Sequence, residues 1–281
     1  MPNTLLGFSF MSWNVKQFRG NHNRTRQIID KIEDLEPDVF GIIEFLAKDQ
    51  ISTILNDDFF KDYSFAFTDS KEEIEIFVGW KKDKFSQAVF TQRRELQVGR
   101  ITMRPGALLS LKETSDGKFT NLLFLHTDSG REFADFTNRQ MMFQKAWDMN
   151  SKLTKIQDEP RLIVLGDLNT MGRKKLSVAK PTISKQTEIE DLEKEAEEFG
   201  MQVLKKSHDL TYRSLGGSLR GDLDHVVASK DLEFEEFSDN DSPNNPHKIQ
   251  VKGWIELDGT AQDDFIKFIS DHCIIYGEVK D

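Results

Sequence analysis

Short apolar runs bounded by polar or turn residues recur along the whole chain. Runs of about four to eight residues that alternate with polar positions, or stay apolar throughout, are typical of β-strands. They predict strands at residues 7–15, 38–45, 63–68, 74–81, 107–112, 119–126, 161–166, 223–228 and 272–279. Because the runs between residues 63 and 126 follow one another closely, we expect a mostly antiparallel meander there.

Helical periodicity is clearest in three segments. They cover residues 22–35, 133–154 and 186–200. The third segment is highly charged, and we expect its acidic side chains to face solvent and Gly200 to end it as a C-cap. Residues 238–248 are polar and rich in turn formers, which predicts a surface loop.

The chain has 281 residues, an even spread of predicted strands, and neither an internal repeat nor a linker. We therefore expect one domain over residues 1–281. Hydrophobic residues make up 37% of the sequence and include 22 Phe, so the material for a folded core is ample.

The net charge of −10 argues against tight, sequence-independent binding of nucleic acid by the protein surface as a whole. Two local basic patches remain as candidates. One comprises Arg93, Arg94, Arg100 and Arg104, and the other comprises Arg173, Lys174 and Lys175. Taken alone, either patch is better explained as a solvated charged loop.

Cys273 is the only cysteine, and its neighbours Ile274 and Ile275 favour a small core residue in a reducing compartment. The first residues contain neither a basic segment nor a small-residue cleavage site, and no stretch approaches the ~18 apolar residues of a membrane span. We expect a cytoplasmic monomer with no membrane partner.

Polar side chains stand where the apolar runs end. VFGIIE ends in Glu44, RLIVLGDLN contains Asp167, and SDHCIIYGEV begins next to Asp271. Carboxylates at the ends of core strands are costly to bury unless a cation or a hydrogen-bond donor meets them, so these ends suggest a shared site. The full set, in chain order, is Asn14, Glu44, His126, Asp167, Asn169, Asp224, Asp271 and His272.

Carboxylate and amide oxygens suit Mg²⁺, or alternatively Mn²⁺, better than zinc, and the sequence offers neither a cysteine cluster nor a closely spaced histidine pair. Each residue alone has a simpler explanation. Asn14 could cap a turn, Glu44 could be a surface acid, and His126 could be a structural histidine. The strength of the prediction lies in the ordered set.

The ordered motifs SWNV, IIE, LFLHT, GDLNT, LDHVV and SDHC resemble the endonuclease/exonuclease/phosphatase superfamily, which includes deoxyribonuclease I and exonuclease III. The resemblance covers nearly the whole chain. It implies an α/β fold with four layers, α/β/β/α, in which two mixed sheets pack face to face and helices lie outside. It also implies a site at one edge, where strand ends and loops meet.

The resemblance assigns roles to individual residues. Glu44 is similar to the principal metal ligand of the superfamily, with Asn14 and Asp271 close to the same ion. Asp167 is similar to the group that orients or deprotonates the attacking water. Asn169, its neighbour, resembles the residue that holds the phosphate.

The three remaining members of the set are two histidines and the acid expected to orient one of them. His272 resembles the histidine that stabilises the phosphate or protonates the leaving oxygen, and Asp224 resembles the residue that orients it. His126 resembles a second histidine of deoxyribonuclease-like, lipid-hydrolysing and tyrosyl-DNA phosphodiesterase members, whereas abasic endonucleases tend to carry Tyr there. An acid, either Glu73 or Glu75, is expected to orient His126.

Three positions qualify the resemblance. Many superfamily members carry an acid two residues after the first Asn, but this chain has Lys16, which favours a contact with the substrate phosphate. Arg104, just before a predicted strand, is also placed to contact the phosphate, and a surface-turn arginine is the equal alternative. His225, next to Asp224, should point to the opposite face of its strand and be dispensable.

In-line attack on a phosphodiester requires an oriented water, positive charge or donors at the non-bridging oxygens, and a proton for the leaving oxygen. The set contains residue types for each. The sequence therefore predicts a Mg²⁺-dependent nuclease that hydrolyses DNA. The alternative is a phosphatase or phosphodiesterase that acts on inositol phosphates or phospholipid head groups, and a catalytically inactive binding scaffold is disfavoured because none of the polar groups is missing.

Overall fold

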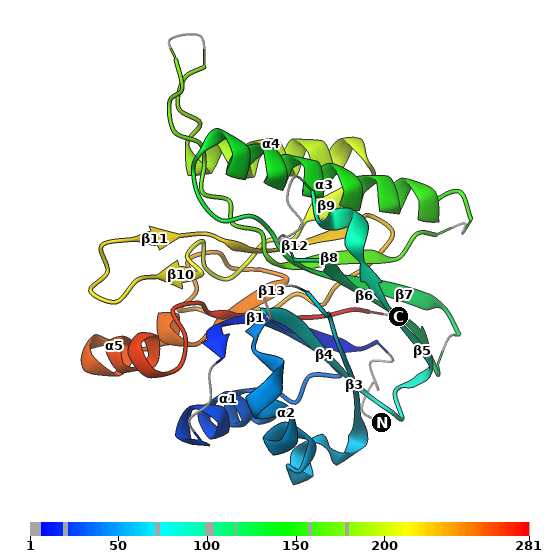
Figure 1. Cartoon of the computed structure of the whole chain (residues 1–281). Helices are drawn as coiled ribbons and strands as arrows, with labels where there is room; N and C mark the ends of the chain where they lie inside the picture. The colour runs from blue at the N-terminus through cyan, green and yellow to red at the C-terminus, as the bar shows by residue number, and fades with distance from the viewer. Residues whose placement is uncertain are drawn as a thin grey trace.

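Within the residues that the structure describes, two six-stranded sheets lie face to face, and helices cover their outer sides (Figure 1). The computed structural model describes residues 7–18, 22–70, 74–98, 104–115, 117–156, 159–177 and 180–280. The four-layered α/β/β/α sandwich with two mixed sheets is confirmed.

The first sheet is mixed. Its spatial order is β13 (Ile249–Lys252), β14 (Ile274–Glu278), β1 (Ser9–Phe18), β2 (Val39–Phe45), β4 (Glu75–Lys81) and β3 (Tyr63–Phe67). β1 and β2 pair in parallel, and the other neighbours pair antiparallel. Parallel neighbours need a crossover connection, which α1 (His22–Leu35) supplies here.

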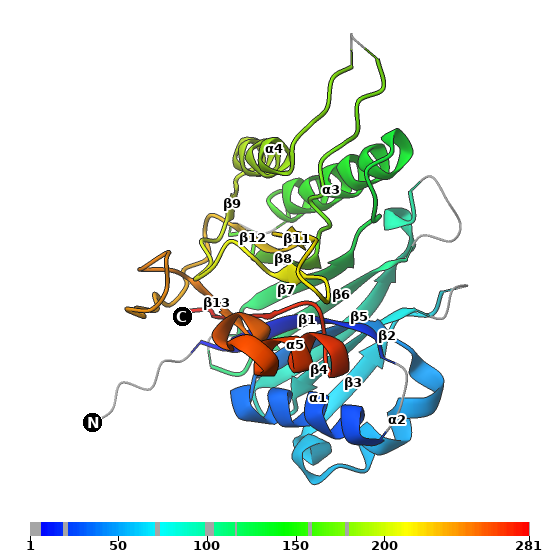
Figure 2. The same cartoon turned by 90° about the vertical axis from the view of Figure 1, so that its left-hand side faces the viewer.

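The second sheet has the same mixed character. Its order is β5 (Phe85–Arg93), β6 (Gly106–Glu113), β7 (Phe119–His126), β8 (Leu162–Asp167), β12 (Asp224–Ser229) and β9 (Met201–Val203). β7 and β8 are parallel, and α3 (Phe133–Leu153) connects them. A hairpin of β10 (Tyr212–Arg213) and β11 (Arg220–Gly221) lies at one edge of the molecule (Figures 1 and 2).

The helices divide between the two outer faces. α1, α2 (Ala47–Leu55) and α5 (Gly259–Phe268) cover the first sheet, and α3 and α4 (Lys185–Glu198) cover the second (Figures 1 and 2). Short 3₁₀ helices cover Asp58–Asp62, Arg94–Leu96 and Trp254–Glu256. Apolar side chains fill the space between the sheets and, separately, the space beneath each helical layer.

Two expectations about regular structure were wrong. The strands between residues 63 and 126 do not form one meander, because β3 and β4 belong to the first sheet while β5, β6 and β7 belong to the second. β5 was not predicted from the sequence. Most of its residues are exposed, so the segment lacks a regular alternation of apolar and polar residues. The acidic face of α4 is not wholly solvated either, because Glu188 is fully buried.

In the described part of the chain, no helix is long and apolar enough to cross a membrane. Cys273 is buried in the core, as its neighbours predicted. The single domain over residues 1–281, the monomeric state and the cytoplasmic location stay predictions.

Candidate active site

Several predicted site residues end rows of apolar side chains that point into the space between the sheets. On β7, Phe124 belongs to the core between the sheets, and His126 is the next residue on the same face. The residues placed in the same way on other strands are Asn14 on β1, Asp167 on β8 and Asp224 on β12. Alternation within the strands therefore directs all four polar side chains to one edge of the core.

Strand pairing then brings three of these residues side by side. Asp167 is the partner of His126 in the parallel pair β7–β8 and the partner of Asp224 in the antiparallel pair β8–β12. All three side chains are buried.

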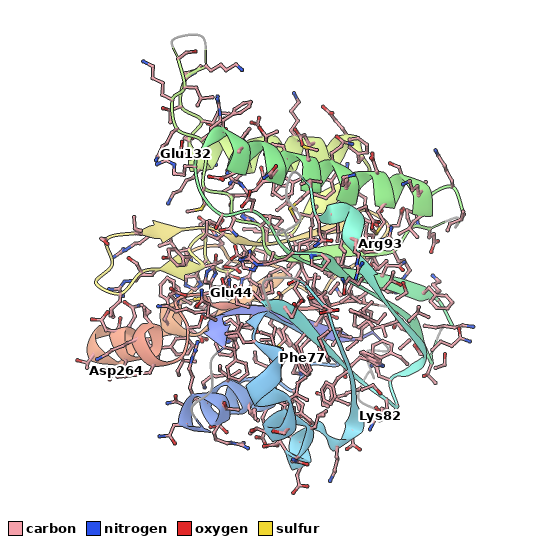
Figure 3. All side chains as sticks on the ribbon, viewed as in Figure 1. Glu44, Phe77, Lys82, Arg93, Glu132 and Asp264 are labelled. Carbon is pink, nitrogen blue, oxygen red and sulfur yellow. The ribbon has the colours of Figure 1, made fainter. Side chains whose placement is uncertain are left out.

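Glu44 reaches this edge by a different route. Strict alternation along β2 would place it with Phe40 and Ile42, which face the helices. The backbone of Glu44 is instead left-handed, with a φ of 63°, and the register of β2 shifts between Ile43 and Phe45. An irregularity of this kind re-aims a side chain, and the Glu44 carboxylate thereby lies between the layers of the molecule (Figure 3).

The backbone geometry of the GDLN motif explains why it contains Gly166 and Asn169. Gly166 has a φ of 133°, and a Cβ there would lie 2.2 Å from the carbonyl oxygen of Leu125. Asn169 is left-handed, with a φ of 48°, a conformation that asparagine tolerates. Its backbone N–H donates to the Asp167 carboxylate at 3.2 Å, and its Nδ2 donates to the Thr127 carbonyl at 3.2 Å. Asn169 is therefore held beside Asp167.

The Ser270-Asp271-His272 turn is tied to β1. The Ser270 hydroxyl donates to the carbonyl oxygen of Asn14 at 2.6 Å and accepts from the backbone N–H of His272 at 3.0 Å. The indole of Trp254 donates to the carbonyl oxygen of Asp271 at 3.0 Å. These bonds fix the turn against the strand that carries Asn14.

The Asn14 amide joins two carboxylates that come from different sheets. Its Nδ2 donates to Glu44 Oε1 at 3.2 Å and to Asp167 Oδ2 at 2.9 Å. Glu44 Oε2 also accepts from the backbone N–H of Gln17 at 2.7 Å. His126 Nε2 lies 3.7 Å from Glu44 Oε1 and 3.6 Å from Asp167 Oδ2. The site is therefore shared by both sheets.

His272 and Asp224 are in direct contact, as predicted. The Asp224 Oδ2 atom lies 2.8 Å from His272 Nδ1, and both side chains are buried. Burial alone would lower the pKa of His272, but the Asp224 and Asp167 carboxylates outweigh it and raise the pKa to about 10. The Tyr212 ring packs on the imidazole with 5.0 Å between centroids. At neutral pH the imidazole is protonated and can donate from both nitrogens.

Two further ionisation equilibria at this edge are shifted. Burial raises the pKa of Asp167 to about 7; His272 opposes this shift, and the nearby Asp224 carboxylate adds to it. Burial also holds the pKa of His126 well below its usual range, and the positive charges of Arg104 and His272 add to this effect. The site thus combines a charged histidine, a neutral histidine and a carboxyl group that titrates near neutrality.

Glu75, one of the two acids expected to orient His126, is held by other groups. Both carboxylate oxygens of Glu75 accept bonds from other groups, namely the Thr68 hydroxyl and the backbone N–H and hydroxyl of Ser70. Among the described residues, His126 Nδ1 has no hydrogen-bond partner. Glu75 therefore does not hold His126, and Glu73 lies outside the described residues.

Lys16 on β1 forms an ion pair with Asp271 of the Ser270-Asp271-His272 turn. The Lys16 Nζ atom lies 3.1 Å from Asp271 Oδ2. Lys16 and Gln17 are both left-handed, and Arg24 donates to the Lys16 carbonyl at 2.9 Å and to the Ile269 carbonyl at 2.9 Å. Lys16 therefore supplies a cation next to one of the predicted metal ligands.

A cavity of about 290 Å³ opens at this edge of the sheets. Glu44, His126, Asp167, Asn169 and His272 line it, together with Arg104, whose Nε is buried without a hydrogen-bond partner in the described part of the chain. Lining residues that the motifs did not predict include Ser129, Arg131, Met171, Lys185, Tyr212 and Arg220. Arg100, from the first basic patch, lies outside the described residues, and Arg93 pairs with Glu95 instead.

The polar side chains at this edge include donors suited to a divalent cation. Glu44 and Asp271 offer carboxylate oxygens, and Asn14 offers an amide oxygen, which accepts from the backbone N–H of Lys16 at 2.9 Å. Asp167, Asp224 and His272 also lie close enough together to hold an ion. In this group, however, the Nδ1 atom of His272 is already engaged by Asp224 Oδ2 at 2.8 Å. Carboxylate and amide oxygens of this kind suit Mg²⁺, and Glu44 and Asn14 are in direct contact.

His225 lies on the opposite face of β12 from Asp224, as predicted. Its Nε2 lies 2.9 Å from the Thr170 hydroxyl, and its Nδ1 lies 3.4 Å from Lys206 Nζ. The Lys206 ammonium also donates to the carbonyl oxygen of Asp224 at 2.7 Å and pairs with the Asp222 carboxylate. This buried group supports β12 from behind and does not reach the cavity-lining face.

We expect the stability of His225→Gln relative to the wild type to depend on pH. Burial, then Lys206, lowers the pKa of His225 well below 6.5 in the folded protein, so below pH 6.5 the unfolded wild-type chain binds a proton that the folded one does not. At about pH 7.5 the variant should be less stable by about 1–3 kcal/mol, because the Thr170 hydroxyl and the Asp222 carbonyl both lose their contact with the buried imidazole. Below pH 6.5 the gap, which is the difference in the free energy of unfolding between the wild type and the variant, should narrow by up to about 1.4 kcal/mol per pH unit. Urea unfolding of both proteins at several pH values measures the gap, and a constant gap would contradict the expectation.

Comparison with known proteins agrees with this architecture. The model of the Endonuclease/Exonuclease/phosphatase family matches residues 11–272. The comparison with curated proteins finds no match.

Solved structures resemble the chain over nearly its full length. Truncated TDP2 from Caenorhabditis elegans is 15% identical, with 98% of each chain covered and a TM-score of 0.63. D. rerio TDP2 complexed with single strand DNA product is 15% identical, with 98% of this chain and 99% of that chain covered and a TM-score of 0.62. The endonuclease/exonuclease/phosphatase from Bacteroides vulgatus is 13% identical, with 98% of each chain covered and a TM-score of 0.62. At these identities the likeness is one of fold.

Proposed function

Because the chain belongs to the endonuclease/exonuclease/phosphatase family, we propose that it is a Mg²⁺-dependent phosphodiesterase that hydrolyses DNA with an activated water molecule. The observation that carries this proposal is the network in which Asn14 joins the Glu44 and Asp167 carboxylates beside the His272–Asp224 pair. Membership of the family supports hydrolysis of a phosphodiester. The Mg²⁺ dependence and DNA as the substrate are our proposal.

Asp167 is the group we assign to the attacking water. Its pKa of about 7 makes the carboxylate a proton acceptor of suitable strength near neutral pH. Asn14 and the backbone of Asn169 hold the carboxylate in place. A water hydrogen-bonded to Asp167 would therefore be both oriented and activated.

His272 is the group we assign to the phosphate and the leaving oxygen. It is held by Asp224 in its charged form, and its Nε2 lies 3.8 Å from Asp167 Oδ2. A charged imidazole can stabilise a phosphoryl oxygen and then give its proton to the departing alkoxide. The acid, in the turn before β14, and the base, at the end of β8, thus face each other from different sheets, with pKa values shifted in the direction that each role needs.

Further contacts with the phosphate are assigned to residues at the cavity. The side chains of Arg104, Asn169 and neutral His126 line it, and Arg104 Nε, which has no hydrogen-bond partner among the described residues, offers a donor for a phosphoryl oxygen. Lys16 adds a positive charge that Asp271 holds in place.

Glu44, Asn14 and Asp271 are the residues that we propose to hold Mg²⁺, or Mn²⁺ in its place. When bound, the ion would supply positive charge to the non-bridging oxygens and orient the phosphate. DNA is proposed as the substrate because D. rerio TDP2, a protein of the same fold, was solved with a single-strand DNA product. The acidic net charge of −10 keeps a small phosphorylated molecule, such as an inositol phosphate or a phospholipid head group, as the second candidate.

A substrate panel with and without chelator tests the proposal. The purified protein should cleave plasmid or linear DNA in Mg²⁺, and excess EDTA should abolish cleavage because the site offers oxygen ligands and no cysteine nucleophile. Added Mg²⁺ or Mn²⁺ should restore it. RNA, inositol phosphates and phospholipids belong in the same panel. Undiminished cleavage in EDTA would exclude the metal mechanism, and turnover of inositol phosphates without DNA cleavage would favour the second candidate.

A further inference from the structure

A two-stranded arm, residues 172–184, projects from the site edge of the molecule beyond the layer of α3 and α4 (Figures 1 and 2). Of this arm the structure describes residues 172–177 and 180–184. Arg173 and Ile183 exchange backbone hydrogen bonds of 2.9 Å, and near the tip Leu176 donates to the carbonyl of Lys180 at 3.1 Å. The arm is therefore a paired hairpin.

The base of the arm is fixed to the site by a buried ion pair. Arg139 on α3 donates to both carboxylate oxygens of Glu188 on α4, at 2.8 and 3.0 Å, and neither side chain is exposed. Arg139 also donates to the carbonyls of Gly172 and Gly130, at 3.0 and 2.8 Å. Gly130 belongs to the segment after His126, so one guanidinium ties the arm to a loop of the cavity. A fully hydrogen-bonded buried pair holds its partners in one geometry.

Both ends of the arm reach the cavity itself. Met171 precedes the arm, Lys185 follows it, and both line the cavity with Asp167. The backbone N–H of Lys174 donates to the carbonyl of Arg131, another lining residue, at 2.8 Å. The arm therefore begins and ends beside the reacting groups.

The charge of the arm is opposite to that of the whole protein. Between residues 170 and 187 the sequence contains no acid, although the net charge of the chain is −10. The basic residues in this stretch are Arg173, Lys174, Lys175, Lys180 and Lys185.

These basic residues differ in what they contact. Arg173 lies over the Phe133 ring at the base, and Lys174 pairs with Glu132, which lies at the foot of the arm (Figure 3). Lys175 and Lys180 are exposed, and neither forms an ion pair within the described residues, although Lys180 Nζ also lies over the Phe133 ring, 5.0 Å from its centroid. They are the cations that the arm offers to a partner.

We propose that the arm binds the sugar–phosphate backbone of a DNA strand at a distance from the bond that is cleaved in the cavity. This inference rests on the proposed function. At about 3.3 Å per residue, the extended strand from residue 172 to residue 177 spans roughly 16 Å. At about 3.4 Å per nucleotide along one strand, that length corresponds to roughly five nucleotides. A polyanion reaches both the cavity and the arm, whereas a small phosphorylated molecule does not.

An arm with two fewer positive charges tests this inference. Lys175→Gln/Lys180→Gln removes the two exposed cations, and Lys152→Gln/Lys155→Gln is the matched control, because it makes the same change at the opposite end of α3, about 30 Å away. The substrates are a single strand of about 20 nucleotides and the p-nitrophenyl ester of thymidine 5′-monophosphate. The arm variant should raise KM for the long strand about tenfold with kcat unchanged, and should leave both constants unchanged for the ester.

Binding of the same labelled strand, measured by fluorescence anisotropy in EDTA, supplies a second readout. The slope of log Kd against log salt concentration should be smaller by about 1.4 in the arm variant than in the wild type, because each lost phosphate contact removes about 0.7. The slope should not change in the control variant. Equal effects of the two double variants, or equal losses on strand and ester, would overturn the inference and leave the proposed function intact. A wild-type protein that turns over the ester but neither binds nor cleaves the strand would overturn both. Arm-dependent binding to phosphatidylserine vesicles without binding of the strand would also overturn both the inference and the proposed function.

Discussion

Glu44→Gln is expected to lower turnover by about a thousandfold or more while the fold stays intact. The amide keeps the shape of the side chain and an acceptor for the Gln17 N–H, but it removes the negative charge that we assign to the metal ion. Glu44 is partly exposed at the cavity, with 19% of its side-chain surface accessible, so the loss of its charge leaves no buried group stranded. The effect should therefore fall on catalysis and metal affinity.

Turnover at saturating Mg²⁺, Mn²⁺ binding by calorimetry and urea unfolding together check this expectation. Glu36→Gln is the matched control, because Glu36 is an exposed glutamate that is also left-handed, with a φ of 48°, and it lies outside the cavity lining. The control should behave as the wild type. Wild-type turnover and metal affinity in Glu44→Gln would mean that Glu44 is an ordinary surface acid and that the metal is bound elsewhere.

Asp224→Asn and His272→Ala are each expected to lower kcat by roughly a hundredfold or more. The physical reason is the buried contact of 2.8 Å between Asp224 Oδ2 and His272 Nδ1, through which the carboxylate keeps the imidazole charged and fixes its orientation. Because the two side chains act as one unit, the double variant should be little worse than either single variant.

A double-mutant cycle on kcat, with the four proteins assayed side by side, measures this coupling. His225→Gln is the control, since His225 lies next to Asp224 in sequence but faces Thr170 and Lys206. Its kcat should stay close to that of the wild type. Fully additive losses in the cycle, or a defect in His225→Gln as large as that in His272→Ala, would show that the wrong residues have been paired.

The sequence was sufficient for the residues whose placement follows from alternation within a single strand. His126, Asp167 and Asp224 continue or begin rows of core side chains, so the period of two that predicts the strand also predicts the side on which they lie. The layered sandwich was predictable for a related reason, because the resemblance rested on motifs that span nearly the whole chain.

Other features depended on contacts between residues far apart in the chain. Glu188 reads as one more solvated acid of α4, yet it is buried because Arg139, 49 residues earlier, neutralises it. β3 and β4 separate from β6 and β7 because the chain crosses from one sheet to the other at residues 82–84, and no local pattern marks this step.

What the sequence by itself determined is the chemistry of the site: which polar residues end the core strands, and that their oxygen-rich set suits a hard cation. What only the tertiary structure decided is how these residues are aimed and what surrounds them. The left-handed bulge turns Glu44 away from the helices, the pairing of β8 sets Asp167 between His126 and Asp224, and the basic arm reaches the cavity. The reason is that side-chain alternation is a local property of one strand, whereas bulges, ion pairs and cavities arise from contacts between segments that only the folded chain brings together.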